Sequence, residues 1–153
     1  MAAPKNGVTL AELIVVVLII GVMASVTIPR MGLSLITTGK TQTTAYKIAA
    51  AIRYARSLAI SNAATNAQGF AVIMIGSGSY TGYKVVNLTS PTPPVETGSI
   101  DSNNVSCTDA DDFIFKPLGN RDGDTDSLTV SGGEKTYVIS VITATGMIKC
   151  EEQ

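Results

Sequence analysis

The sequence contains no histidine and no tryptophan, and charged residues make up only 15% of it. Histidine is the commonest general base and metal ligand near neutral pH, so its absence excludes a Ser-His-Asp triad, a Cys-His pair and a histidine metal site. Adjacent acids such as Asp111 and Asp112 would point to opposite faces of a strand. These absences argue against an enzyme, and we expect no cofactor.

The few charges are distributed unevenly along the chain. Residues 1–62 contain six basic residues and one acid, whereas residues 63–153 contain five basic residues and eleven acids, a net charge of −6. Binding to nucleic acid depends on neutralising its phosphates with basic side chains. An acidic C-terminal part therefore argues against nucleic acid as a partner.

The longest apolar run lies near the N-terminus. Between Val8 and Ile28 there are 21 residues and a single charge, Glu12. At about 1.5 Å per residue, a helix of that length matches the thickness of a bilayer core. We therefore predict a membrane-spanning helix over residues 8–30. An intramembrane carboxylate is costly, so Glu12 is a candidate functional residue unless it reaches the membrane interface and has no role.

A second helical pattern follows the apolar run. Pro29 is expected to kink the helix, because proline removes a backbone hydrogen bond and clashes with the preceding turn. The apolar residues then recur at i, i+4, i+7 and i+11, in Ile48, Ile52, Ala55 and Ala59. Such a stripe predicts an amphipathic helix over residues 31–62 that packs on the rest of the chain.

Residues 63–153 are expected to form a β-rich globular head. Phe70–Ile75 predicts a strand, Gly76–Ser79 a turn, and Tyr80–Leu88 a returning strand. The stretch Thr89–Asp112 contains three prolines and is predicted to be a long extended loop. Lys116–Asp126 is predicted to be rich in turns. Further strands are predicted at Phe113–Phe115, Leu128–Val130, Thr136–Thr143 and Met147–Cys150.

The N-terminal residues also carry a specific resemblance. Lys5-Asn6-Gly7 followed by Val8-Thr9-Leu10-Ala11-Glu12-Leu13 resembles the leader and cleavage site of type IV pilins and type II secretion pseudopilins. The resemblance implies that residues 1–7 are a leader, that prepilin peptidase cuts between Gly7 and Val8, and that the new N-terminus at Val8 is methylated. The family usually has phenylalanine where this chain has Val8. An ordinary helix-start glycine is the alternative for Gly7.

The resemblance implies an α+β pilin fold. In that fold a long N-terminal helix, with a membrane-spanning first half and an amphipathic second half, packs on an antiparallel sheet head. It also implies a single-pass protein of the bacterial inner membrane, with a cytoplasmic N-terminus and a periplasmic head, that later enters a pilus or pseudopilus. The implied partners are prepilin peptidase, other pilin subunits, the inner membrane and its assembly platform. An uncleaved membrane anchor is an alternative, and a Sec signal peptide fits less well because no A-x-A site follows the apolar run.

Three further segments are similar to one subfamily. Ile52–Ile60, Phe113–Gly119 and Val141–Lys149 resemble the minor pseudopilin H of type II secretion and the FimT-like minor pilins. This similarity implies a minor structural subunit that initiates or caps a fibre. The alternatives are a DNA-binding minor pilin for DNA uptake, against which the acidic head argues, and a major pilin.

Cleavage after Gly7 would place a free amine close to Glu12. In a bundle of apolar helices, an unpaired carboxylate or ammonium costs several kcal/mol. We therefore predict that Glu12 of one subunit pairs with the Val8 amine of its neighbour and sets the axial register between them.

The two cysteines, Cys107 and Cys150, both lie in the predicted head. Outside the cytoplasm the environment is oxidising, so a disulfide is expected, with two free buried thiols as the alternative. It would close a loop of about 44 residues and stabilise the head by about 4 kcal/mol.

Two remaining polar patterns are interpreted as surface features. Asp122, Asp124 and Asp126 alternate around a glycine, which resembles part of a calcium loop, but the glycine and glutamate positions of such a loop are not matched. A solvated turn is the preferred interpretation, and no metal is expected. Arg53 and Arg56 are interpreted as solvated or subunit-facing charges on the helix, and a basic patch that one ligand could touch is the alternative.

Overall fold

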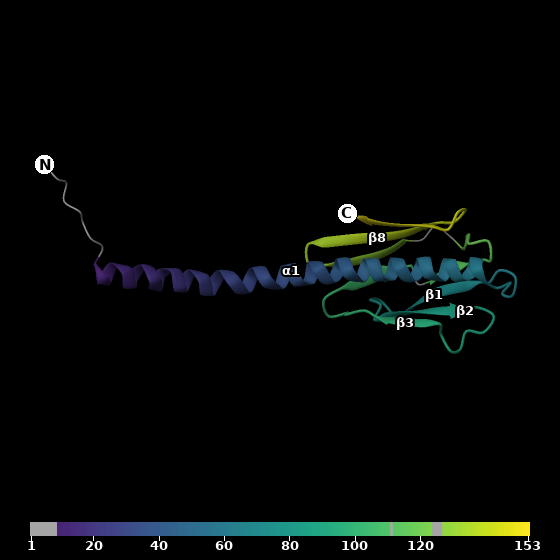
Figure 1. Ribbon diagram of the computed structural model, residues 1–153, viewed down its shortest axis with the longest axis horizontal. Helices are drawn as coiled ribbons and strands as arrows, with labels where there is room; N and C mark the ends of the chain where they lie inside the picture. The colour runs from purple at the N-terminus through teal and green to yellow at the C-terminus, as the bar shows by residue number, and fades with distance from the viewer. Residues whose placement is uncertain (1–8, 111, 124–126) are drawn as a thin grey trace. The chain divides into compact units, whose positions relative to one another are not determined.

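The computed structural model describes residues 9–110, 112–123 and 127–153, and for residues 26–33 it describes the backbone alone. The chain divides into two compact units, Met1–Leu35 and Ile36–Gln153. The helix α1, Leu10–Ser61, contributes to both units (Figure 1). Its residues 10–35 belong to the first unit, and its residues 36–61 belong to the second.

The second unit continues from α1 into a series of short strands. They are β1 (Phe70–Ile75), β2 (Gly82–Asn87), β3 (Glu96–Ser99), β4 (Ser106–Asp109), β5 (Asp112–Phe115), β6 (Arg121–Asp122), β7 (Ser127–Gly132), β8 (Lys135–Ile142) and β9 (Met147–Glu152). Within the described residues these strands form two antiparallel sheets, one in the order β3-β2-β1-β5-β6 and the other in the order β4-β7-β8-β9.

The second half of α1 buries one face. Ile48, Ile52, Ala55 and Ala59 are at most 1% exposed, so the apolar stripe predicted from the sequence is the face that packs inward. The polar positions on the other side of the helix, Arg53 among them, are exposed. Burial of each large aliphatic side chain stabilises the fold by roughly 1.5–3 kcal/mol. This burial keeps the second half of the helix packed on the head.

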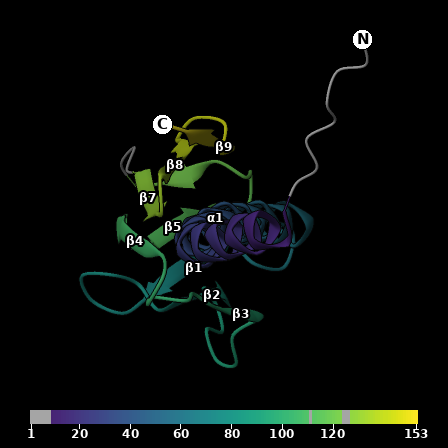
Figure 2. The ribbon, with the colours of Figure 1, turned by 90° about the vertical axis from the view of Figure 1, so that its left-hand side faces the viewer.

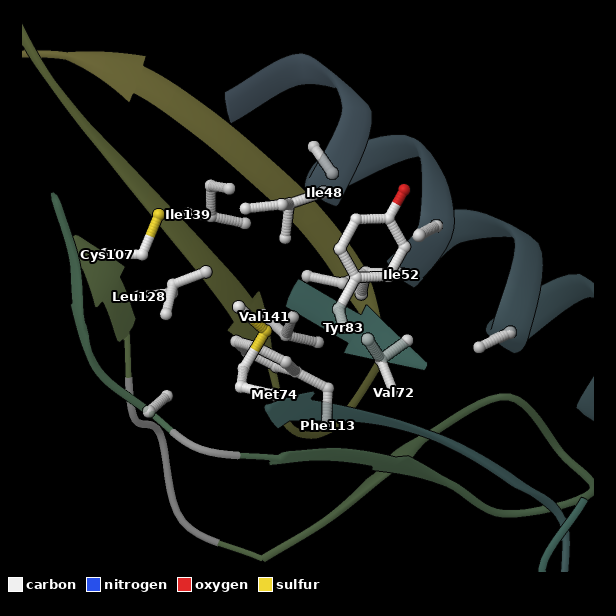
Figure 3. Close-up of a cluster of buried hydrophobic side chains, with 14 of the residues drawn as sticks. Ile48, Ile52, Val72, Met74, Tyr83, Cys107, Phe113, Leu128, Ile139 and Val141 are labelled. Atoms are coloured by element: carbon white, nitrogen blue, oxygen red, sulfur yellow. The ribbon is translucent and has the colours of Figure 1, made fainter. Parts of the chain in front are cut away.

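Side chains from both sheets complete the same core. Along β8, Tyr137, Ile139 and Val141 are buried while the alternate residues are half-buried, as expected for a strand with one face on a core. Phe113 and Phe115 of β5 are fully buried. Figure 3 shows these groups meeting: Phe113, Ile139 and Val141 lie among Ile48 and Ile52 of the helix.

The predicted long loop at Thr89–Asp112 contains two strands. β3 pairs with β2, and Tyr83 lies opposite Gly98, where a Cβ atom would collide with the tyrosine ring. β4 pairs with β7, with Cys107 opposite Val130. Both strands are short and polar, so only their distant partners identify them.

The predicted fold class is wrong. The pilin fold was expected to have a helix whose first half spans the membrane and a head with one antiparallel sheet. The described strands instead form two sheets: β3 is an outer strand of the first, and β4 pairs with β7 in the second. Among the described residues, no helix combines the length and the apolar character that crossing a bilayer requires. This finding also contradicts the predicted single-pass location in the inner membrane.

Candidate functional site

The first described turns of α1 form an apolar surface that no described residue covers. From Leu10 to Met23 the large apolar side chains are between 50% and 79% exposed. They lie on every side of the helix, and Glu12 is the single charge among residues 10–25. A helix that is apolar all round is normally buried by other apolar groups. Residues 10–25 are therefore the candidate assembly helix.

Thr9 and Glu12 define the start of this helix. The backbone N–H of Glu12 donates to the Thr9 Oγ1 at 3.3 Å, and the N–H of Leu13 donates to the Thr9 carbonyl oxygen at 3.2 Å. The spacing Thr9-x-x-Glu12 is that of a capping box, a sequence signal that our interpretation missed. An acid in the first turn also interacts favourably with the helix dipole. The Glu12 carboxylate has no hydrogen bond or ion pair with any described residue.

Three predicted features of the N-terminal segment are not described by the structure. Gly7 and Val8, the predicted cleavage and methylation positions, lie outside the described residues. Pro29 lies within 26–33, where no side chain is described. Cleavage, methylation and the helix kink therefore stay predictions.

The predicted disulfide is not formed, and both cysteines are free. Cys107 lies on β4 and Cys150 on β9, which are the two outer strands of a four-stranded sheet. Three strand spacings of about 4.8 Å separate them by roughly 14 Å, whereas a disulfide needs Cα atoms about 4.4–6.8 Å apart. Burial raises the pKa of the Cys107 thiol to about 11. Burial also raises the pKa of Cys150, against the opposing effect of Arg53.

The weak calcium candidate is described only at Asp122. Its carboxylate forms an ion pair with Lys116, with Nζ and Oδ1 2.9 Å apart. Asp124 and Asp126 lie outside the described residues. Over the part of the chain that the structure describes, no three potential metal ligands lie close together.

Arg56 has a structural role that the sequence did not indicate. Its Nε donates to the Gly119 carbonyl oxygen at 3.0 Å, and its Nη2 donates to the Thr145 carbonyl oxygen at 3.0 Å. These carbonyls belong to the β5–β6 turn and the β8–β9 turn, one in each sheet. The interpretation of Arg56 as a solvated or subunit-facing charge missed these two hydrogen bonds within the chain. Arg53 stays exposed and lines a groove of about 500 Å³ beside Ile142, Met147 and Ile148.

Comparison with known proteins found no matching family model, curated protein or solved structure.

Proposed function

We propose that this chain is a structural subunit, of the minor class, in a type IV pilus or a type II secretion pseudopilus. Prepilin peptidase removes residues 1–7, the amine of Val8 is methylated, and the subunit assembles through residues 10–25 of α1. The observation that carries the proposal is that this segment is apolar on every side, exposed, and marked by one carboxylate near its start.

Apolar contact supplies the driving force for this assembly. Covering a Val, Leu or Ile side chain contributes roughly 1.5–3 kcal/mol, and the equivalent helices of other subunits are a matching surface. The same packing would bury the Glu12 carboxylate, which costs several kcal/mol unless a cation pairs with it. The Val8 amine of a neighbouring subunit is that cation, and methylation keeps its charge. The pair therefore fixes the register that apolar contacts alone leave undefined.

The test compares Glu12→Gln with Glu134→Gln in cells that assemble the fibre. Both changes remove one exposed carboxylate, but Glu134 lies in the turn between β7 and β8. We expect Glu12→Gln to accumulate normally and to be depleted at least tenfold from sheared fibres, whereas Glu134→Gln enters them normally. Normal entry of Glu12→Gln would contradict the charge pairing. Mass spectrometry of the mature N-terminus checks cleavage after Gly7 and methylation of Val8.

The charges of the second unit support a structural role over DNA binding. Lys40, Lys116, Lys135 and Lys149 form ion pairs with acids, and Arg56 donates to backbone carbonyls. Each of these cations has an acid or a backbone carbonyl beside it, and the neighbouring acids repel a phosphate backbone. Salt-dependent binding of duplex DNA would revive the alternative of a DNA-uptake pilin.

A further inference from the structure

The strand β9 is the outer strand of its sheet, and its second edge is open. It pairs with β8 on one side, and no described strand lies on the other (Figure 2). From Met147 to Glu151 its residues alternate between exposed and half-buried, Glu152 is exposed, and none is fully buried. An open edge of six residues without proline presents unpaired backbone groups that can pair with another strand.

The backbone groups that face this open edge can be identified from the ladder. The N–H of Gln153 donates to the Thr136 carbonyl oxygen at 2.9 Å, so it faces β8. Because these directions alternate along an antiparallel strand, the backbone groups of Lys149 and Glu151 also face β8. Those of Ile148, Cys150 and Glu152 then face the open edge.

The side chains of β9 are self-complementary about Cys150. Lys149 and Glu151 flank it and share the outer face, with side chains 49% and 70% exposed. When two copies of β9 are aligned antiparallel with Cys150 opposite Cys150, each Lys149 lies opposite a Glu151 of the other copy. Moving the centre by one residue in either direction places lysine opposite lysine or glutamate opposite glutamate. Opposite charges stabilise a cross-strand pair and like charges destabilise it, so the charges select the Cys150-centred register.

We propose that two copies of this chain pair edge to edge through β9, antiparallel and centred on Cys150, to form one continuous eight-stranded sheet. Such a contact is two-fold symmetric and therefore closes as a dimer. It cannot join successive subunits of a polar fibre, so it goes beyond the proposed function and does not depend on it.

Oxidative cross-linking tests the pairing directly. Opposite residues of a hydrogen-bonded antiparallel pair have Cα atoms about 5.5 Å apart, a distance that a disulfide spans. The full chain, dispersed in a non-ionic detergent, is treated with diamide, which takes two protons and two electrons from the two thiols. We expect a disulfide dimer through Cys150, identified by peptide mapping, that Cys150→Ser abolishes. Cys107 is fully buried and should not react.

Charge reversal separates this pairing from non-specific association of the apolar helices. Lys149→Glu and Glu151→Lys each place like charges opposite one another, and each should lower the association of the heads by about two- to thirtyfold. The double variant restores both pairs and should restore cross-linking. Equal cross-linking of the native chain, the two single variants and the double variant would overturn the proposal. So would the absence of a Cys150 dimer in the native chain, or evidence that β9 of one copy pairs with β3 of another. Glu12→Gln should leave the dimer unchanged, so failure of the proposed function is distinguishable.

Discussion

Replacing Arg56 with alanine is expected to destabilise the head by about 2–3 kcal/mol. The change removes two hydrogen bonds of 3.0 Å from a charged donor, and such bonds contribute about 1.5–3 kcal/mol each when buried. The bond to Gly119 is part-buried and the bond to Thr145 is exposed, so the second should contribute less. Two turns from different sheets would lose their common attachment to the helix.

Arg53→Ala provides the matched control for this prediction. Arg53 lies on the same helix but is exposed, and surface changes of this kind usually alter stability by less than about 0.5 kcal/mol. Urea unfolding followed by far-ultraviolet circular dichroism measures both variants, with unchanged m-values expected. Equal midpoints for Arg56→Ala and Arg53→Ala would refute the structural role assigned to Arg56.

Three further predictions concern the second unit. Gly146→Ala should lower the free energy of unfolding in urea by about 2 kcal/mol or more, because φ is +66° and a Cβ would collide with the backbone of Gly119. Gly78→Ala is the control: its φ is +83° but the space around it is open, so it should lower that free energy by about 1 kcal/mol. The hydrogen bond from Lys135 lowers the pKa of the Glu152 carboxyl below its ordinary value of 4.5. The ionised carboxylate should therefore stabilise the fold at pH values above 4.5, and this stability should be lost as the pH falls through the lowered pKa. Glu152→Gln should flatten that part of the plot of stability against pH. Iodoacetamide should label Cys150 in the native protein and Cys107 only after unfolding, and a Cys107–Cys150 disulfide peptide would contradict this.

The regular elements with strong local patterns could be predicted from the sequence. The strand Phe70–Ile75 was predicted with the bounds that the structure gives, because a compact apolar run is followed at once by glycine and serine. The stripe of Ile48 and Ile52 was also found, since its spacing is set within the helix itself.

The features that were missed depend on contacts between distant residues. β3 and β4 are short polar strands, and only pairing with β2 and β7 makes them strands. The disulfide prediction failed because cysteine spacing says nothing of strand order, which places Cys107 and Cys150 at opposite edges of one sheet. The role of Arg56 depends on two turns that the chain reaches more than 60 residues later.

The helix from Leu10 to Ser25 is the feature on which the functional account depends, and cross-linking from its middle tests that account most directly. A photoreactive benzoylphenylalanine in place of Val16, which is 50% exposed, reports what covers the helix in assembled fibres. We predict adducts that join Val16 to residues 10–25 of a neighbouring subunit. Fibres that contain the chain but yield no such adduct would contradict assembly through this helix.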